Sequence, residues 1–148
     1  MSFPQYGQCK DSGVPWLGQI PRHWEAKRIG YLTSRISSGK TPFGGSDVYV
    51  DEGIIFLRSQ NIYDEGMQLD DVVFISETVD AQMAVSRVQP KDILLNITGA
   101  SIGRSCVVPI DFPPANVNQH VCAIRMENQD HVRFVSWCFT NQFTDHYS

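Results

Sequence analysis

The sequence predicts an α+β domain dominated by strands, with short helices and long polar loops. Short apolar runs at residues 54–57 (IIFL) and 72–75 (VVFI) are bounded by polar or turn-forming residues, which is typical of buried strands. Helical spacing of apolar residues is confined to two segments. A chain of 148 residues is long enough to bury one core, so we expect a single domain over residues 1–148.

The N-terminal part of the chain predicts little regular structure. Residues 1–23 are rich in glycine and proline and predict an irregular arm within the domain, with Trp16 and Trp24 as aromatic anchors. Residues 25–29 predict a short strand. Residues 36–45 (ISSGKTPFGG) predict a loop, because glycine and proline interrupt any regular pattern there.

The middle of the chain predicts two strands followed by a short helix. The apolar runs named above are continuous enough for strands buried on both faces. Ser76 is suited to cap the N-terminus of the helix. Val79 and Met83 supply an i, i+4 apolar pair, and this helix must end before Pro90.

The C-terminal part predicts three more strands and a second helix. The strands are expected at residues 93–98, 103–108 and 117–125. Asp130 can cap the helix that follows. The apolar residues of this helix recur at helical spacing, namely Val132, Val135, Phe139 and Phe143.

The net charge of −4 is unevenly distributed. Residues 1–40 carry six basic and two acidic residues, whereas residues 41–95 carry three basic and ten acidic residues. Neutralising DNA phosphates requires clustered lysine and arginine. A domain that is basic on one side could face DNA, but its acidic middle would repel it. Charge alone therefore leaves nucleic-acid binding open.

Composition excludes several classes of protein. No apolar run approaches the roughly 20 residues that span a bilayer, and the first 13 residues lack the pattern of a signal peptide. We therefore expect a cytoplasmic protein without a membrane partner. The cysteines are scattered, with no CxxC pair or zinc spacing, and predict reduced thiols and no structural metal. They are Cys9, Cys106, Cys122 and Cys138.

Two motifs that could indicate catalysis fail on their context. Gly39-Lys40-Thr41 matches the end of a phosphate-binding loop, but Ser34 stands where that motif requires glycine, and the following Pro42 prevents a helix. Asp11 with Glu25-Ala26-Lys27 matches the acid…ExK spacing of metal-dependent nucleases, yet so loose a pattern is common by chance. We expect both to be structural or solvated.

Methyl transfer and nucleophilic catalysis are no better supported. The chain has no glycine-rich strand–turn–helix fingerprint for a nucleotide cofactor. Its histidines stand beside no serine or cysteine with the signature of an activated nucleophile. They are His23, His120, His131 and His146. We expect no catalytic residue, no metal and no cofactor in this chain.

Uncharged polar residues instead follow the predicted buried strands directly. Arg58-Ser59-Gln60-Asn61 follows one strand, and Asn96 and Thr98 lie in another. Asparagine and glutamine match the donor–acceptor pair of adenine, and arginine matches guanine. Serine and threonine can hold phosphates. The alternative is that such residues satisfy loop backbone groups, which is common beside glycine.

The same clusters belong to stretches that resemble the specificity subunit family of type I restriction–modification systems. The resemblance covers essentially the whole chain, in order and in spacing. It lies in KDSGVPWLGQIPRHWEAKRI (residues 10–29), ISSGKTP (36–42), GIIFLRSQNI (53–62) and DILLNITGASIGRSCVVP (92–109), continued by NVNQHVCAIR (116–125).

The resemblance implies a non-catalytic specificity subunit that reads one half of a bipartite double-stranded DNA target. Such subunits have two target-recognition domains, each followed by a long spacer helix. They bind methyltransferase (M) subunits, which carry S-adenosylmethionine, and through them restriction (R) subunits, which use ATP and Mg²⁺. The chain is expected to hold a truncated N-terminal recognition domain, with the spacer helix and second recognition domain absent.

The resemblance and the residue chemistry together select candidate DNA-binding side chains. They are Ser38, Lys40, Thr41, Arg58, Gln60, Asn61, Ser101, Arg104, Asn118, Gln119 and His120. Ser38, Lys40 and Thr41 are expected to hold phosphate, and the others to contact phosphate or base edges. Base specificity is expected mainly in residues 43–51 and 63–71, whose acids could accept from cytosine amino groups. The alternative function is a protein-interaction scaffold of the complex without direct DNA readout.

Overall fold

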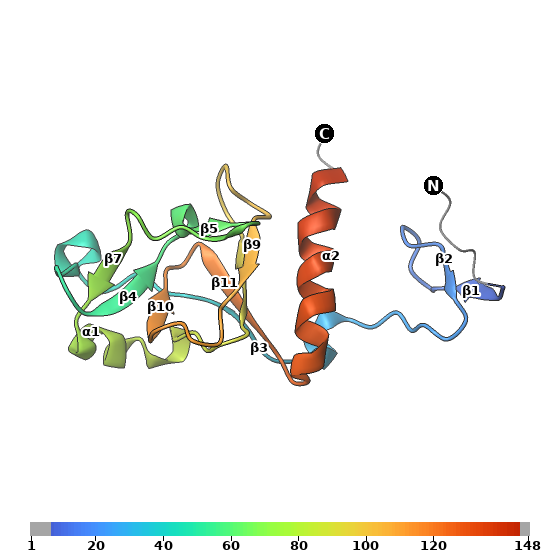
Figure 1. Cartoon of the computed structure of the whole chain (residues 1–148), viewed down its shortest axis with the longest axis horizontal. Helices are drawn as coiled ribbons and strands as arrows, with labels where there is room; N and C mark the ends of the chain where they lie inside the picture. The colour runs from blue at the N-terminus through green and yellow to red at the C-terminus, as the bar shows by residue number, and fades with distance from the viewer. Residues whose placement is uncertain (1–6, 146–148) are drawn as a thin grey trace. The chain divides into compact units, whose positions relative to one another are not determined.

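A computed structural model describes residues 7–145 of the chain, and the side chains of residues 7–140. The chain divides into two compact units at Leu32, where a single domain was expected over residues 1–148. The N-terminal unit comprises the described residues up to Leu32, drawn in blue in Figure 1. The C-terminal unit begins at Thr33 and contains the two larger sheets and both α-helices.

The N-terminal unit is a small hairpin followed by an irregular segment. Strand β1 (Cys9–Asp11) pairs antiparallel with β2 (Gln19–Pro21), so the prediction of an irregular arm is wrong for these residues. No strand forms at residues 25–29, because this mostly charged and exposed segment has no apolar alternation to bury, and a 3₁₀-helix, η1, follows at Ile29–Leu32.

The two tryptophans of this region do not act as buried anchors. Trp16 is 70% exposed and Trp24 is 43% exposed. Indole rings at those exposures contribute little apolar burial, so the prediction that they anchor the arm is wrong. Their sequence signal, two aromatics spaced along a glycine- and proline-rich stretch, indicates nothing about burial by itself.

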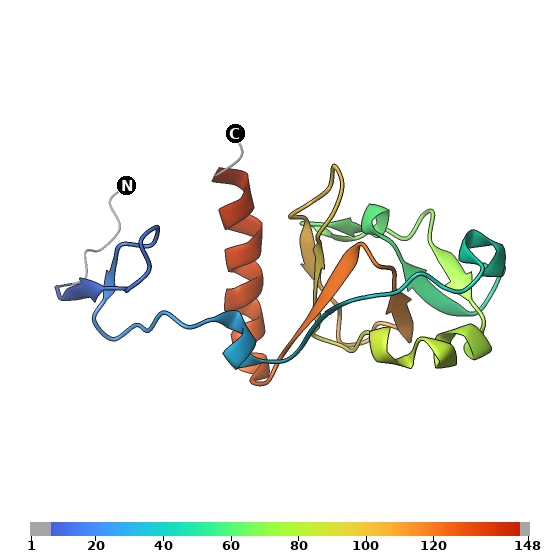
Figure 2. The ribbon, with the colours of Figure 1, turned by 180° about the vertical axis from the view of Figure 1, so that it is seen from behind.

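The C-terminal unit contains two sheets and a second hairpin (Figures 1 and 2). The four-stranded antiparallel sheet has the order β3-β11-β8-β9, formed by Thr33–Ser38, Val121–Met126, Ile93–Asn96 and Ser105–Val107. The three-stranded sheet has the order β10-β4-β7, formed by Ala115–Val117, Ile54–Leu57 and Val73–Ile75. The hairpin pairs β5 (Ile62–Tyr63) with β6 (Gly66–Met67).

Helices connect and cover these strands. The α-helices are α1 (Glu77–Gln82) and α2 (Val132–Asp145). The 3₁₀-helices are η2 (Gly45–Val48), η3 (Ser59–Asn61), η4 (Ala84–Ser86) and η5 (Gln129–His131). In the part of the chain that the structure describes, no helix combines the length and the hydrophobicity needed to cross a bilayer.

Several sequence predictions for this unit are confirmed. The α+β class dominated by strands is correct, and the IIFL run forms β4. Ser76 caps α1, since the Val79 N–H donates to the Ser76 hydroxyl at 3.2 Å. The Val79 and Met83 side chains then pack against a small core cluster around Phe56.

Two predicted boundaries in this unit are wrong, for related reasons. Residues 36–38 belong to β3 and not to a loop, because pairing with β11 holds them extended despite their polar composition. The single strand predicted at residues 117–125 is two strands in different sheets, β10 and β11. The turn at residues 118–120 separates them, and apolar content alone does not reveal such a turn.

The second helix begins slightly differently from the prediction. Asn128 caps the 3₁₀-helix η5, which precedes α2, since the Asp130 N–H donates to the Asn128 Oδ1 at 3.0 Å. Asp130 therefore donates its backbone amide and does not act as the capping side chain. Val132 is buried at the start of α2, and Val135 and Phe139 are partly buried, as predicted. The Phe143 side chain and His146 lie outside the described residues.

The main core of the unit lies where the two sheets meet. It includes Leu57 of β4, Leu94 of β8, and Val117 and Val121 at the two ends of the turn between β10 and β11, all fully buried. Because β10 belongs to one sheet and β11 to the other, the chain crosses from sheet to sheet at this turn. The turn is therefore fixed by apolar packing on both sides.

Gly39 makes the closest backbone approach to this turn. Its N–H donates to the Val121 carbonyl at 3.0 Å, and the Lys40 N–H donates to the Val117 carbonyl at 3.3 Å. A Cβ atom at position 39 would lie 1.9 Å from the Val117 oxygen. Only glycine allows the loop after β3 to lie against the turn in this way.

Replacing Gly39 with alanine is therefore expected to destabilise the C-terminal unit by about 1–3 kcal/mol or more, because backbone on both sides must move. Urea denaturation followed by circular dichroism measures the change. Gly30→Ala is the matched control, since a Cβ there meets nothing within 4 Å. Equal stability of the two variants would contradict the close approach.

Candidate nucleic-acid interface

The ends of several strands meet at one edge of the C-terminal unit. Ser38 at the end of β3 pairs with Cys122 at the start of β11, and Asn96 at the end of β8 pairs with Val121. Strands β4 and β10 run parallel and end together at Leu57 and Val117. Their following loops must therefore leave the sheets on the same side, as Figure 1 shows for the turn after β4 and the loop after β8.

Hydrogen bonds connect these loops to one another. The Asn118 N–H donates to the Leu57 carbonyl at 3.0 Å, and the Ile97 N–H donates to the His120 carbonyl at 3.1 Å. The Asn96 amide donates to the Ser59 carbonyl at 2.8 Å. We call the side chains of residues 38–41, 58–60, 97–104 and 118–120 the strand-end surface.

The loop after β3 contributes exposed polar side chains to this surface. Ser38, Lys40 and Thr41 are all exposed. Among the described residues, none of the three side chains forms an ion pair or a hydrogen bond. Lys40 is therefore a solvated ammonium on a backbone held in place by Gly39, which suits contact with a phosphate.

The residues after β4 have a different role, because Asp71 engages all three predicted side chains. The Arg58 guanidinium donates to the Asp71 carbonyl at 2.7 Å, the Asn61 amide donates to the Asp71 carboxylate at 2.9 Å, and Gln60 donates to the same carboxylate. Asn61 is fully buried. Its Oδ1 also accepts the Arg58 N–H at 2.9 Å, so these residues hold the loop together.

The loop after β8 presents Arg104 and shields Ser101. The Ser101 hydroxyl accepts from the Asn96 amide at 3.1 Å. The Arg104 guanidinium lies over the Tyr63 ring, 4.6 Å from its centroid. Among the described residues, Arg104 forms no ion pair. It is thus a partly exposed cation that neighbouring acids leave unneutralised.

The turn between β10 and β11 contributes an exposed polar pair. Asn118 is buried, and its Oδ1 accepts the His120 N–H at 3.0 Å, so its side chain holds the turn. The His120 ring lies 2.6 Å from the Thr98 hydroxyl and 3.2 Å from the Gln119 amide. Gln119 is exposed, and its amide is held beside a ring that Thr98 orients.

The structure therefore places the predicted candidates at one edge but divides them by role. Lys40, Thr41, Gln119 and Arg104 present atoms to solvent, together with Ser38 and His120. Asn61 and Asn118 are buried in loop hydrogen bonds. Sequence reasoning missed the partners that impose this division, which are Asp71, Thr98 and Tyr63. The spacing of Asp71 from Arg58 carries no signal for the pairing, because the β5–β6 hairpin brings them together.

The acidic segments expected to carry base specificity are only partly available. The Asp71 carboxylate is occupied as described, and the Asp64 carboxylate accepts the Ser105 N–H at 3.0 Å. The carboxylates of Asp47 and Asp51 are exposed and form no hydrogen bond or ion pair with other described residues. Base readout by Asp64 or Asp71 would therefore compete with structural hydrogen bonds, whereas Glu65 and Asp70 are exposed and form no side-chain hydrogen bond with other described residues.

The two motifs that could indicate catalysis, at residues 39–41 and at Asp11 with residues 25–27, have ordinary local contacts in the structure. No helix begins at Lys40. Asp11 accepts the Gly13 N–H at 2.9 Å, and Glu25 pairs with Lys27 at 3.2 Å in an exposed position. Among the described residues, no group of three histidine, cysteine, aspartate or glutamate side chains is placed to hold a metal ion.

The cysteine thiols are poorly suited to act as nucleophiles. Burial, with a smaller contribution from the Asp64 charge, raises the pKa of Cys106 to about 12. Burial also raises the pKa values of Cys122 and Cys138. Because their pKa values are raised, these three thiols are protonated at neutral pH. A thiol must ionise before it can attack as a nucleophile.

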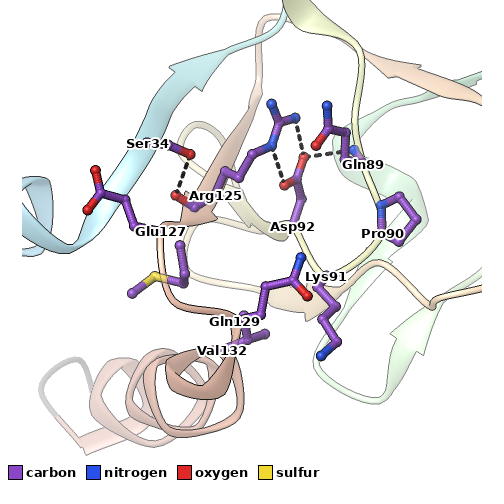
Figure 3. Close-up of a pocket in the computed structure, with 10 residues that line it drawn as sticks. Ser34, Gln89, Pro90, Lys91, Asp92, Arg125, Glu127, Gln129 and Val132 are labelled. Carbon is purple, nitrogen blue, oxygen red and sulfur yellow. Dashed lines mark hydrogen bonds and ion pairs between the residues drawn. The ribbon is translucent and has the colours of Figure 1, made fainter.

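A pocket of about 280 Å³ lies at the opposite end of the four-stranded sheet, where β3 and β8 begin and β11 ends (Figure 3). The Asp92 carboxylate in its wall accepts two hydrogen bonds of 2.9 Å from Arg125 and one of 2.8 Å from the Gln89 N–H. Asp92 is 1% exposed, so this ion pair is buried on the carboxylate side. The Asp92 carboxylate and the Arg125 guanidinium therefore satisfy each other and are not offered to a ligand.

Comparisons with known proteins place this fold. No protein-family model and no curated protein matches the chain. Among solved structures, the chain is similar to the HsdS subunit from Thermoanaerobacter tengcongensis, with a TM-score of 0.56 and 15% identity over 90% of this chain and 32% of the other. It is also similar to a chain from a study of complex assembly and conformational transition of the type I R-M system, with a TM-score of 0.60 and 16% identity over 86% of this chain and 30% of the other.

The likeness shows the fold of this chain. This chain spans about a third of the length of each of the two similar chains. The fold expected from the sequence resemblance is confirmed.

We predict that Asp71→Ala lowers stability by about 1–3 kcal/mol, because it removes the carboxylate that accepts from the buried Asn61 amide and from Gln60 and that lies 3.9 Å from the Arg58 guanidinium. Urea denaturation measures the loss. The adjacent Asp70→Ala is the control, since Asp70 is exposed and forms no side-chain hydrogen bond with other described residues. A loss of the same size in both variants would show that the Asp71 network contributes nothing.

Proposed function

We propose that this chain is a non-catalytic specificity module that binds double-stranded DNA in a sequence-specific manner. In a type I restriction–modification complex it would read one half of a bipartite target and direct methylation or cleavage by partner subunits. The observation that supports this most is the strand-end surface, where loops from both sheets are hydrogen-bonded together and present exposed polar and cationic side chains. The specificity-subunit fold supports the same role.

The side chains of this surface have the chemistry that DNA contact requires. Lys40 and Arg104 are cations without acidic partners among the described residues, and each can contact phosphate. Arginine can also donate two hydrogen bonds to guanine, and the Gln119 amide can match adenine. Loops fixed to the ends of the strands carry these groups. Their backbone therefore loses little conformational entropy when DNA binds.

The charge of the C-terminal unit supports specific rather than general DNA binding. Residues 33–148 contain eight lysine and arginine residues against 14 aspartate and glutamate residues, a net charge of −6. Non-specific affinity for DNA arises almost entirely from phosphate neutralisation. A unit with this charge gains little from non-specific contact, so its affinity must come from fitting particular base pairs at a few positions.

Catalysis and cofactors belong to other subunits in this proposal. The chain would bind no cofactor itself. Methyltransferase subunits would carry S-adenosylmethionine, and restriction subunits would use ATP and Mg²⁺. The alternative is a scaffold that binds a protein partner and leaves DNA readout to other parts of the complex. Binding of the chain to selected duplexes separates the two functions.

Lys40→Ala is expected to weaken binding to all duplex sequences by a similar factor and to reduce the slope of log K against log salt by about 0.9, the value for one phosphate contact. Duplexes retained from a random library at low salt provide the ligands, and binding is then titrated across salt concentrations. The control is Arg133→Ala, which removes one exposed positive charge from α2.

Arg133→Ala is expected to leave that slope unchanged. Equal losses in the two variants would indicate a general charge effect and not contact at the strand-end surface. If the library yields no retained duplex even at low salt, the proposed DNA binding is wrong and the scaffold function is favoured.

A further inference from the structure

Two arginines of the C-terminal unit lie over tyrosine rings, but only one of them is otherwise paired. The Arg104 guanidinium lies 4.6 Å from the centroid of Tyr63, and that of Arg58 lies 6.0 Å from the centroid of Tyr49. Arg58 also donates to the Asp71 carbonyl at 2.7 Å and lies 3.9 Å from its carboxylate. Arg58 is therefore committed to the protein.

Arg104 has no such commitment among the described residues. It forms no ion pair there, and no side-chain hydrogen bond of its guanidinium to another described residue is present. The Tyr63 ring supports the guanidinium from one side, and the N–H donors of the guanidinium form no hydrogen bond to another described residue. The contact with Tyr63 therefore holds the guanidinium in position and leaves its N–H donors available.

The backbone fixes both members of the pair. Tyr63 belongs to β5, which pairs with β6, and the next residue, Asp64, accepts the Ser105 N–H at 3.0 Å. The Arg104 carbonyl accepts the Asn96 N–H at 2.9 Å, at the point where the loop after β8 closes. Hydrogen bonds on either side of the ring and the guanidinium thus hold the two side chains in register.

We propose that Tyr63 is a positioning residue that presets the Arg104 guanidinium for a paired hydrogen-bond acceptor on DNA. The proposal rests on the proposed function and deepens it. A phosphate and the O6/N7 edge of guanine both present two acceptors that match the arginine fork. By holding the guanidinium in place before DNA binds, Tyr63 reduces the side-chain entropy that Arg104 loses on binding.

A double-mutant cycle tests this proposal on the full chain. Tyr63→Ala is expected to weaken duplex binding about 2- to 30-fold, which corresponds to the range of cation–π interactions. Tyr63→Phe keeps the ring and is expected to bind like the unsubstituted chain. In the Arg104→Ala background, Tyr63→Ala is expected to cause no further loss, because the group that it positions is absent.

Two measurements separate positioning from a general loss of structure. Tyr63→Leu keeps most of the apolar volume, and its binding is expected to fall with that of Tyr63→Ala while urea denaturation shows folded protein. Tyr31→Ala is the control, since it removes a tyrosine ring that is 77% exposed and lies in the N-terminal unit, outside the strand-end surface. That variant is expected to leave the affinity for DNA unchanged as long as it is folded.

The pattern of loss identifies the acceptor. If Arg104→Ala loses the same affinity on all duplexes, and its salt slope is reduced by about 0.9, the acceptor is a phosphate. If Arg104→Ala loses affinity only for duplexes with guanine at one position, and its salt slope is unchanged, the acceptor is a base edge. Either pattern supports the proposal.

The proposal is overturned if Tyr63→Ala costs the same affinity with and without Arg104, or if Tyr63→Phe fails as Tyr63→Ala does. It is also overturned if Arg104→Ala binds like the unsubstituted chain. These outcomes leave the proposed function intact, because the unsubstituted chain still binds. Absence of binding by the unsubstituted chain is instead a failure of the proposed function itself.

Discussion

The turn between β10 and β11 is the constraint on which the arrangement of the candidate interface depends. Asn118 donates its N–H to the Leu57 carbonyl and accepts the His120 N–H on its side chain, so one residue links the end of β4 to the turn. His120 then accepts the Ile97 N–H from the loop after β8. Gly39 lies against the same turn from the other side. Without this turn, the polar loops would have no shared frame.

This arrangement explains why the polar side chains fall into two groups. Buried amides such as Asn61 and Asn118 accept hydrogen bonds from backbone N–H groups of the loops. Leaving those N–H groups unpaired near the core would cost free energy. That network holds exposed groups such as Lys40 and Gln119 at defined positions. Recognition surfaces need both kinds of residue, because an exposed donor is selective only when its backbone is rigid. The Asp71 hydrogen bonds therefore contribute to function through structure.

Sequence reasoning predicts the buried strands well and the roles of their polar neighbours poorly. The IIFL run forms β4 because its apolar continuity reflects burial, which is a local property. Whether Asn61 is buried or exposed depends on Asp71, which only the β5–β6 hairpin brings near. The division of residues 117–125 between two sheets likewise depends on Leu57, a distant partner. The Tyr63–Arg104 contact has no sequence pattern at all, since tertiary packing brings strand β5 and the loop after β8 together.

Mapping backbone amide chemical shifts of the labelled chain as a selected duplex is added tests the central claim most directly. The account predicts that the largest changes fall on residues 38–41, 58–60, 97–104 and 118–120, which lie on different loops but on one edge. Changes concentrated instead around Asp92 and Arg125, at the opposite end of the sheet, with the strand-end residues unaffected, would contradict it.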